Sequence, residues 1–289
     1  MSDNPGGGGL INLGELSKPA TVLIEKISDA VGGIAKPWQT VRVAKAEARA
    51  DLIRVQTKME ISEIEQRALL RMVREEGKRQ ENIENITAKA IPHLAPDSKP
   101  EEVDDDWITH FFERCRLISD VEMQSLWAKM LAGEANKQGA FSKKTVNLVA
   151  AFDKSDAELF TIFCTFVWQI GDICPIIDDS QNKLFTDVGI NFSTLTHLDD
   201  IGLITFDGIA HLARQHLPKS LTVAYYGKPL LIEFDGDENM LRTGHVMLTQ
   251  MGHQLAPICG SHPSENYRMY VLEKWLASGY TLSSPVRAT

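Results

Sequence analysis

Residues 119–134, SDVEMQSLWAKMLAGE, indicate a helix that packs inside a bundle of helices. Ser119 and Glu122 form an S-x-x-E capping box, in which the serine oxygen accepts a backbone N–H and the glutamate reaches back to the helix start. Trp127 and Leu131 follow at helical spacing on the apolar side of the same helix. We therefore expect Trp127 and Leu131 to lie in the core.

The bundle predicted around this helix covers residues 107–175. It would contain a helix over residues 107–117, another that Ser142 caps, and a third that begins at a second capping box, residues 155–158. The third helix enters an uncharged run of thirteen residues, 159–171. A membrane span needs about 18 residues or more, so we interpret this run as one buried core helix.

The region 176–289 differs, with β-prone runs between short helices. A helix over residues 192–200 leads into Ile201-Gly202-Leu203-Ile204, an order typical of a winged helix in which Gly202 turns the chain into a wing strand. The other elements expected are a hairpin around Gly227-Lys228, a strand at 246–248, a helix that Thr249 caps and a last helix at 267–277. The sequence therefore predicts a mainly α fold with a smaller, winged-helix-like α+β part.

The first part of the chain divides into a glycine-rich start and a long helical region. We expect residues 1–9, MSDNPGGGG, to be flexible and residues 10–94 to be mostly helical. Four apolar residues recur there at helical spacing: Leu23, Ile24, Ile27 and Val31. This stripe would either pack on the following helix or, with its neighbouring lysines, lie on a membrane surface.

Residues 38–94 have the composition of a long helix, with Gly77 as the one glycine. A heptad pattern over residues 38–59 predicts a coiled coil, whereas the absence of apolar residues over 74–82 indicates a bend or loop near Gly77. A long thin helix cannot bury its apolar stripe on itself. We therefore expect a homo-oligomer that is held together by residues 10–94, with two or three helices that pack within one chain as the alternative.

Four basic side chains, Arg67, Arg71, Arg74 and Lys78, recur at i, i+4, i+7 and i+11 and would share one helical face. This face is a candidate nucleic-acid contact, and a solvated surface balanced by nearby glutamates is the alternative. The next segment, residues 95–106 (APDSKPEEVDDD), is acidic and contains two prolines. We interpret it as a solvated linker at a domain boundary.

Charge and cysteine content narrow the class of protein. The 289 residues carry a net charge of −9, and residues 95–289 hold 26 Asp/Glu against 16 Lys/Arg, which argues against broad phosphate binding there. The four cysteines form no C-x-x-C pair, and no signal peptide opens the chain. We expect reduced thiols and a cytoplasmic location, with the surface of the inner membrane as the alternative.

The stretch 119–134 and its surroundings resemble an uncharacterised bacterial family with a W-A-x-x-L-A-G-E signature and are similar to abortive-infection alpha-type proteins. The residues that carry the resemblance are Gln124, Trp127, Leu131, Gly133 and Glu134, followed by an Asp156-Ala157-x-x-Phe160 run. The resemblance covers residues 107–165 and implies a bacterial protein linked to phage defence. It implies no known activity, so we expect these positions to be structural, with Ala132-Gly133-Glu134 ending the helix.

No motif indicates catalysis, a cofactor or a metal centre. His253, Cys259 and His262 lack the paired spacing of metal ligands, and the pair Asp178-Asp179 has no evident partner and is expected in a solvated loop. There is no G-x-x-x-x-G-K-[ST] loop and no G-x-S-x-G elbow. We expect a non-enzymatic, multimerising interaction protein whose protein partner is unknown. A nucleic-acid-binding regulator that uses the winged-helix-like region is the first alternative, and an enzyme in the C-terminal half of the chain is the second.

Overall fold

The computed structural model describes residues 16–31 and 62–284. The chain divides into two compact units, residues 1–146 and residues 147–289. The glycine-rich start and the heptad pattern of residues 38–59 lie outside the described residues, so their predictions stay predictions.

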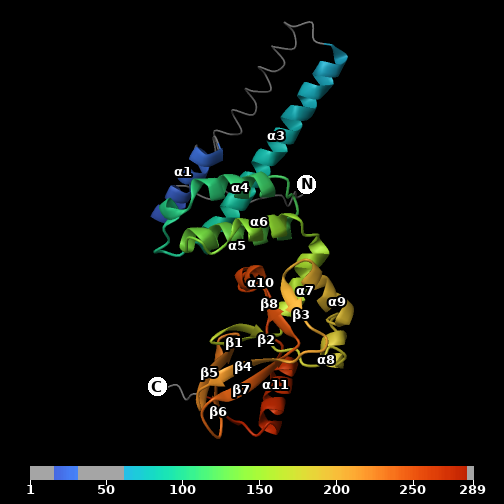
Figure 1. The fold of residues 1–289 in the computed structure, drawn as a ribbon. Coiled ribbons are helices and arrows are strands. Elements are labelled where there is room, and N and C mark those ends of the chain that lie inside the picture. The colour runs from blue at the N-terminus through green and yellow to red at the C-terminus, as the bar shows by residue number, and fades with distance from the viewer. Residues whose placement is uncertain (1–15, 32–61, 285–289) are drawn as a thin grey trace, which may run out of the picture. The chain divides into compact units, whose positions relative to one another are not determined.

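The described elements of unit 1 are all helical. They are α1 (Lys18–Val31), α3 (Glu63–Ala90), the 3-10 turns η2 (Ile91–His93) and η3 (Pro100–Glu102), α4 (Asp105–Cys115), α5 (Val121–Asn136) and α6 (Lys143–Ala150), whose last residues pass the border between the units (Figure 1). The core of unit 1 forms where α1, α4, α5 and the C-terminal part of α3 meet. Phe111 and Trp127, both fully buried, pack there edge to face with their ring centroids 5.1 Å apart.

Helix α3 runs without a break from Glu63 to Ala90 and therefore passes through Gly77. The bend expected near Gly77 was wrong, because a single glycine inside a helix costs only about 1 kcal/mol and removes no backbone hydrogen bond.

The acidic segment 95–106 belongs to the packed part of unit 1 and is not a solvated linker. Pro100 and Val103 are buried, and the N–H of Lys99 donates to the carbonyl oxygen of Ala135 on α5 at 3.1 Å. The Lys26 ammonium on α1 donates to the Glu101 carbonyl oxygen at 2.8 Å and lies 3.1 Å from a carboxylate oxygen of Asp105. Of the acidic side chains of this segment, Asp105 pairs with Lys26. The border between the units falls after residue 146 instead.

Two helices begin at aspartates and not at the serines that were expected to cap them. Asp120, not Ser119, caps α5, because its carboxylate accepts from the N–H groups of Glu122 and Met123 at 3.0 and 2.9 Å. Helix α7 likewise begins after Asp153, two residues before Ser155. A carboxylate at the N-cap also interacts favourably with the positive end of the helix dipole. Ser142 caps α6 as predicted, accepting from the N–H of Thr145 at 3.2 Å.

Unit 2 combines helices with antiparallel sheets. Its elements are α7 (Lys154–Cys164), β1 (Val167–Ile170), β2 (Asp172–Pro175), α8 (Lys183–Thr186), α9 (Phe192–Asp200), β3 (Ile204–Phe206), β4 (Leu212–Leu217), β5 (Ser220–Tyr225), β6 (Lys228–Glu233), β7 (Asn239–Gly244), β8 (Val246–Leu248), α10 (Gln250–Leu255), α11 (Glu265–Ala277) and β9 (Thr281–Ser283). The largest sheet has the order β2-β1-β5-β6-β9, while β3 pairs with β8 and β4 with β7. Helix α11 packs on the large sheet through Trp275, whose ring lies 4.8 Å from that of Trp168 on β1.

The uncharged run 159–171 is not one core helix. Helix α7 ends at Cys164, and Val167–Ile170 forms strand β1, which pairs with β2 across Gly171. Gly171 has a φ of +70°, a value that glycine adopts at little cost and that allows a tight turn. The β-branched and aromatic residues of β1 fit a pleated sheet better than a continued helix.

Several elements of unit 2 lie where the sequence predicts them. The hairpin of β5 and β6 turns at Tyr226 and Gly227, both with positive φ, as two-residue hairpin loops require. Helix α9 has the predicted bounds, and Thr249 caps α10. Strand β3 follows α9 and pairs with β8. The strands that lie between these two in the sequence, β4 to β7, belong to the other two sheets. Unit 2 therefore has a mixed α and β fold with antiparallel sheets.

Candidate functional site

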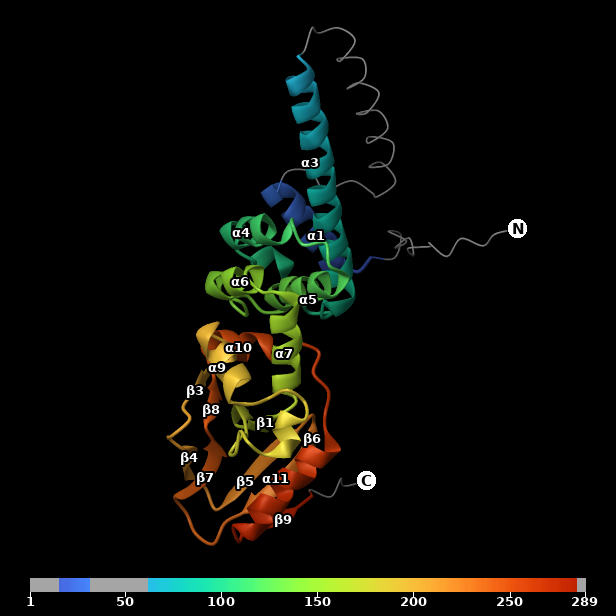
Figure 2. The same ribbon diagram turned by 90° about the vertical axis from the view of Figure 1, so that its right-hand side faces the viewer.

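The first five turns of α3, residues 63–81, contain no buried side chain, and we call this segment the arm. In Figures 1 and 2 the arm extends beyond α1, α4 and α5. It nevertheless carries large apolar side chains, since Ile64 is 71% exposed, Met72 58% and Leu70 44%. Ile64 and Met72, eight residues apart, share one side of the helix, whereas Leu70 lies on another side. Contiguous exposed apolar side chains such as the first two are typical of an interaction surface.

The predicted nucleic-acid contact consists of four basic residues that all lie exposed on the arm: Arg67, Arg71, Arg74 and Lys78. Arg67 lies 3.9 Å from Glu63 and Arg71 lies 3.6 Å from Glu75, one turn away in each case. The arm as a whole has five Lys/Arg and five Asp/Glu residues. Its net charge is therefore zero, which gives little of the attraction on which nucleic-acid binding depends.

The C-terminal turns of α3, residues 82–90, contain all the buried residues of this helix and contact the predicted motif residue Gln124. The Gln124 side-chain amide donates to Asn82 Oδ1 at 3.2 Å and to the Ile118 carbonyl oxygen at 3.0 Å, and its oxygen accepts from Lys89 Nζ at 3.1 Å. Burial lowers the pKa of Lys89. Because every polar atom of Gln124 is bonded within unit 1, this residue fixes α3 against α5 and is not available to a ligand.

The end of the motif has a structural explanation as well. A Cβ atom on Gly133 would lie 2.6 Å from the ring of Phe141, so only glycine allows this ring to approach α5. The Glu134 carboxylate, which is 3% exposed, accepts from the N–H groups of Gly139 and Phe141 at 2.7 and 2.9 Å. Burial raises the pKa of Glu134, and these backbone donors oppose the rise. Gly133 and Glu134 therefore do not end α5, which continues to Asn136, but hold the following loop against it.

The remaining motif residues, Trp127 and Leu131, are fully buried, as the sequence predicts. Core packing accounts for Leu131 and for the rings of Trp127, whereas the Trp127 Nε1 atom is buried without a hydrogen-bond partner.

The apolar stripe of α1 is covered. Leu23 and Ile27 are fully buried, Ile24 and Val31 are half-buried, and the helix packs mainly on α4 and η3. A membrane surface could reach this stripe only after α1 separated from unit 1. In the described residues, no helix combines the length and the apolar character that a membrane span needs.

Unit 2 contains a polar cluster that the sequence analysis missed. Asp178 follows β2, and its carboxylate accepts from the Tyr270 hydroxyl at 2.7 Å and forms an ion pair with Lys274. The Lys274 ammonium also lies 4.8 Å from the centre of the Tyr270 ring. Burial lowers the pKa of Lys274. The expectation that Asp178 lies in a solvated loop without a partner was therefore wrong.

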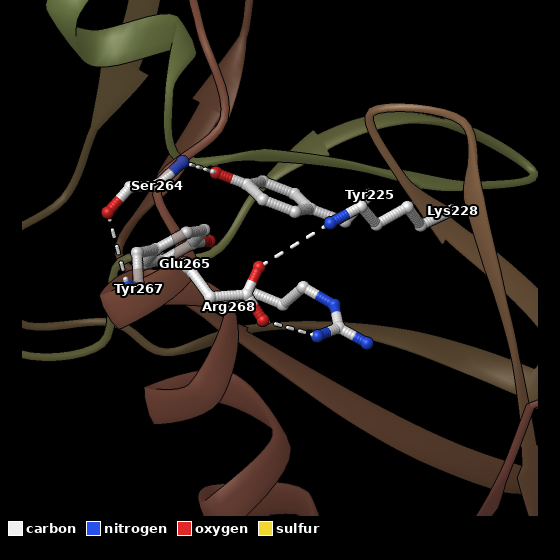
Figure 3. Close-up of polar contacts among 6 residues, drawn as sticks. All are labelled: Tyr225, Lys228, Ser264, Glu265, Tyr267 and Arg268. Carbon is white, nitrogen blue, oxygen red and sulfur yellow. Dashed lines mark hydrogen bonds and ion pairs between the residues drawn. The ribbon is translucent and has the colours of Figure 1, made fainter.

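The helix that carries Tyr270 and Lys274 is anchored at its first turn (Figure 3). Ser264 caps α11, and its own N–H donates to the hydroxyl oxygen of Tyr225 at 2.8 Å. Glu265 pairs with Arg268 at 2.6 Å and with Lys228, at the hairpin turn, at 3.6 Å. Burial raises the pKa of Tyr225 to about 12, so its hydroxyl keeps its proton at neutral pH. These contacts fix α11 relative to the large sheet.

No three His, Cys, Asp or Glu side chains gather as metal ligands within residues 16–31 and 62–284. His253, of the sequence triplet His253, Cys259 and His262, instead lies 3.7 Å from Asp172. The polar cluster at Asp178 could not be found from spacing, because Asp178 and Tyr270 are 92 residues apart in the chain.

Comparison with known protein families gives a match over most of the chain. A family model described as protein of unknown function (DUF2806) matches residues 66–272, which is more than half of the chain and includes most of the arm. No curated protein and no solved structure matches the chain.

Proposed function

The chain belongs to the family described as protein of unknown function (DUF2806), and we propose that it is a non-enzymatic interaction protein that multimerises through the arm of α3. The observation that carries the proposal is the exposure of Ile64, Leu70 and Met72 on a helix half that has no buried residue. Removing about 100 Å² of apolar surface from water contributes roughly 2.5 kcal/mol. Several of these side chains must therefore be covered together to offset the loss of translational and rotational freedom on association.

A second copy of the same chain is the partner that we propose. The arm has equal numbers of acidic and basic residues, so it neither repels another arm strongly nor favours a highly charged partner. Two arms can also bring the same apolar side chains together, as isologous interfaces do.

Sedimentation velocity of the full chain over a range of micromolar concentrations tests this proposal. We expect the wild-type chain to form oligomers and the double variant Ile64→Glu/Met72→Glu to stay monomeric. The matched control is Leu117→Glu/Val121→Glu, which also places two charges at side chains of unit 1 that are each 65% exposed. A monomeric wild type, or an equal loss of oligomer in the control, would reject the proposal.

Nucleic-acid binding is the second candidate, and the exposed basic side chains of the arm support it better than the winged-helix comparison does. Helix α9, which would be the recognition helix, reads FSTLTHLDD and has no Lys or Arg. If this candidate is right, affinity for duplex DNA falls steeply as salt rises, and Arg67→Gln/Arg71→Gln/Arg74→Gln weakens it. An absence of binding to DNA and RNA at low salt, measured by fluorescence anisotropy, would exclude it.

A role in phage defence rests on the resemblance of residues 107–165 alone. If the protein acts in defence through multimers, cells that express the wild type will show fewer phage plaques than cells that express Ile64→Glu/Met72→Glu. Equal plaque counts would reject the role in phage defence and would not affect the proposal that the chain multimerises.

Contact with a membrane surface is the weakest of these proposals, because Leu23 and Ile27 are buried. Co-sedimentation of the full chain with anionic vesicles would support a location at the inner membrane. A chain that stays in the supernatant would argue against it.

A further inference from the structure

A cavity of about 520 Å³ lies within unit 2, beside the polar cluster of Asp178, Tyr270 and Lys274. Pockets for small molecules typically measure about 300–1,000 Å³, so this one has room for a compact organic ligand. Buried apolar residues of α11, among them Val271 and Trp275, form part of its lining. The apolar lining favours a ligand with an apolar body.

The walls of the cavity include aromatic rings. Tyr270 and Tyr280 both line it, from α11 and from the turn that follows this helix. The Tyr280 hydroxyl donates to the Met240 carbonyl oxygen at 3.3 Å, and the Tyr270 hydroxyl donates to Asp178, so each ring is held by its polar end. Rings held in this way present flat surfaces against which a planar ligand can pack.

The charges that line the cavity favour an anion. Asp178 is the one acidic residue of the lining, and its charge is already matched by Lys274 and by the Tyr270 hydroxyl. Arg242 also lines the cavity, on the exposed side of β7, where residues alternate between buried and exposed. After the pair of Asp178 and Lys274 is discounted, the lining retains the positive charge of Arg242.

We propose that this cavity binds a small organic anion, whose carboxylate or phosphate lies near Arg242 and whose planar body packs between Tyr270 and Tyr280. The site is separate from the arm and needs no second copy of the chain, so it goes beyond the proposed multimerisation. Arginine suits both head groups, because its planar donors match the oxygens of a carboxylate and of a phosphate.

The first test uses the fluorescent anion 8-anilinonaphthalene-1-sulfonate as the probe, titrated into the full chain. We expect saturable binding at one site per chain that weakens as salt rises. Arg242→Gln should weaken binding about tenfold, which corresponds to about 1.4 kcal/mol. Ala277→Trp, at an exposed residue of the lining, should abolish binding by filling the cavity.

The matched control is Arg214→Gln, because Arg214 pairs with Leu241 across β4 and β7 but does not line the cavity. It should bind the probe as the wild type does. Thermal unfolding followed by circular dichroism checks that each variant is folded. No saturable binding to the wild type, or equal binding by folded Arg242→Gln, Ala277→Trp and wild-type chains, would overturn the proposal.

Competition then distinguishes the head groups. Adenosine 5′-monophosphate and indole-3-acetate are the two anions, and adenosine is the neutral control. Displacement of the probe by the phosphate alone, by the carboxylate alone or by both anions supports the proposal and assigns the head group. Displacement by neither anion, or equal displacement by adenosine, would overturn it.

Discussion

The two parts of helix α3 differ in burial although they form one continuous helix. In residues 82–90, Ile86 and Thr87 are fully buried and Asn82 bonds to α5, whereas residues 63–81 contain no buried side chain. Residues 82–90 contain more weak helix formers than the arm, namely two Asn, two Ile and one Thr, so helical propensity does not explain why they are the buried part. The buried part is stabilised by packing within unit 1, and the apolar residues of the arm must be explained in another way. A function in association is the explanation that we propose.

The largest expected effect is a difference in the free energy of unfolding between two matched substitutions, one in the buried part of α3 and one in the arm. Ile86→Ala should lower the free energy of unfolding by about 2–5 kcal/mol, because it leaves a cavity at a fully buried site. Ile64→Ala, the matched change in the arm, should lower it by less than about 0.5 kcal/mol when the chain is dilute. Urea unfolding followed by circular dichroism measures both. Similar losses for the two variants would show that the arm is packed within the chain.

A smaller effect is expected at Asn82, where the burial of α3 begins. The side-chain amide of Asn82 donates to the Arg116 carbonyl oxygen at 2.9 Å, and its oxygen accepts from Gln124. Asn82→Ala removes the donor to the Arg116 carbonyl and one of the two acceptors of the buried Gln124 amide, and should cost about 1–3 kcal/mol. Gln66→Ala, at an exposed residue of the arm, is the control and should leave the urea midpoint unchanged. An unchanged midpoint for Asn82→Ala would mean that the polar network does not hold α3 in place.

The smallest effect is expected for the charges of the arm. Arg71→Gln removes an exposed pair with Glu75 one turn away, which is worth only about 0.2–0.5 kcal/mol. The same variant should leave the oligomer intact, because apolar contact and not charge is proposed to hold it. Sedimentation velocity at two salt concentrations would measure this. Oligomers that dissociate in Arg71→Gln, or as salt rises, would shift the explanation from apolar to electrostatic contact.

Local signals in the sequence predicted much of the fold but not the polar cluster. Helix α9, the β5–β6 hairpin and the cap at Thr249 depend on a few neighbouring residues, and all three lie where they were expected. The run 159–171 was misread, because a short apolar run does not distinguish a helix from a strand. Asp178 was missed because its partners come from α11, far along the chain.

The central claim is that the arm contacts a second copy of the same chain. Photo-cross-linking of the full chain tests this claim most directly. The residue p-benzoylphenylalanine is placed either at Met72 on the arm or, as the control, at Val121, a similarly exposed position of α5. We expect irradiation to give a covalent dimer of the chain from position 72 and none from position 121. No dimer from position 72, or equal yields from the two positions, would contradict the account.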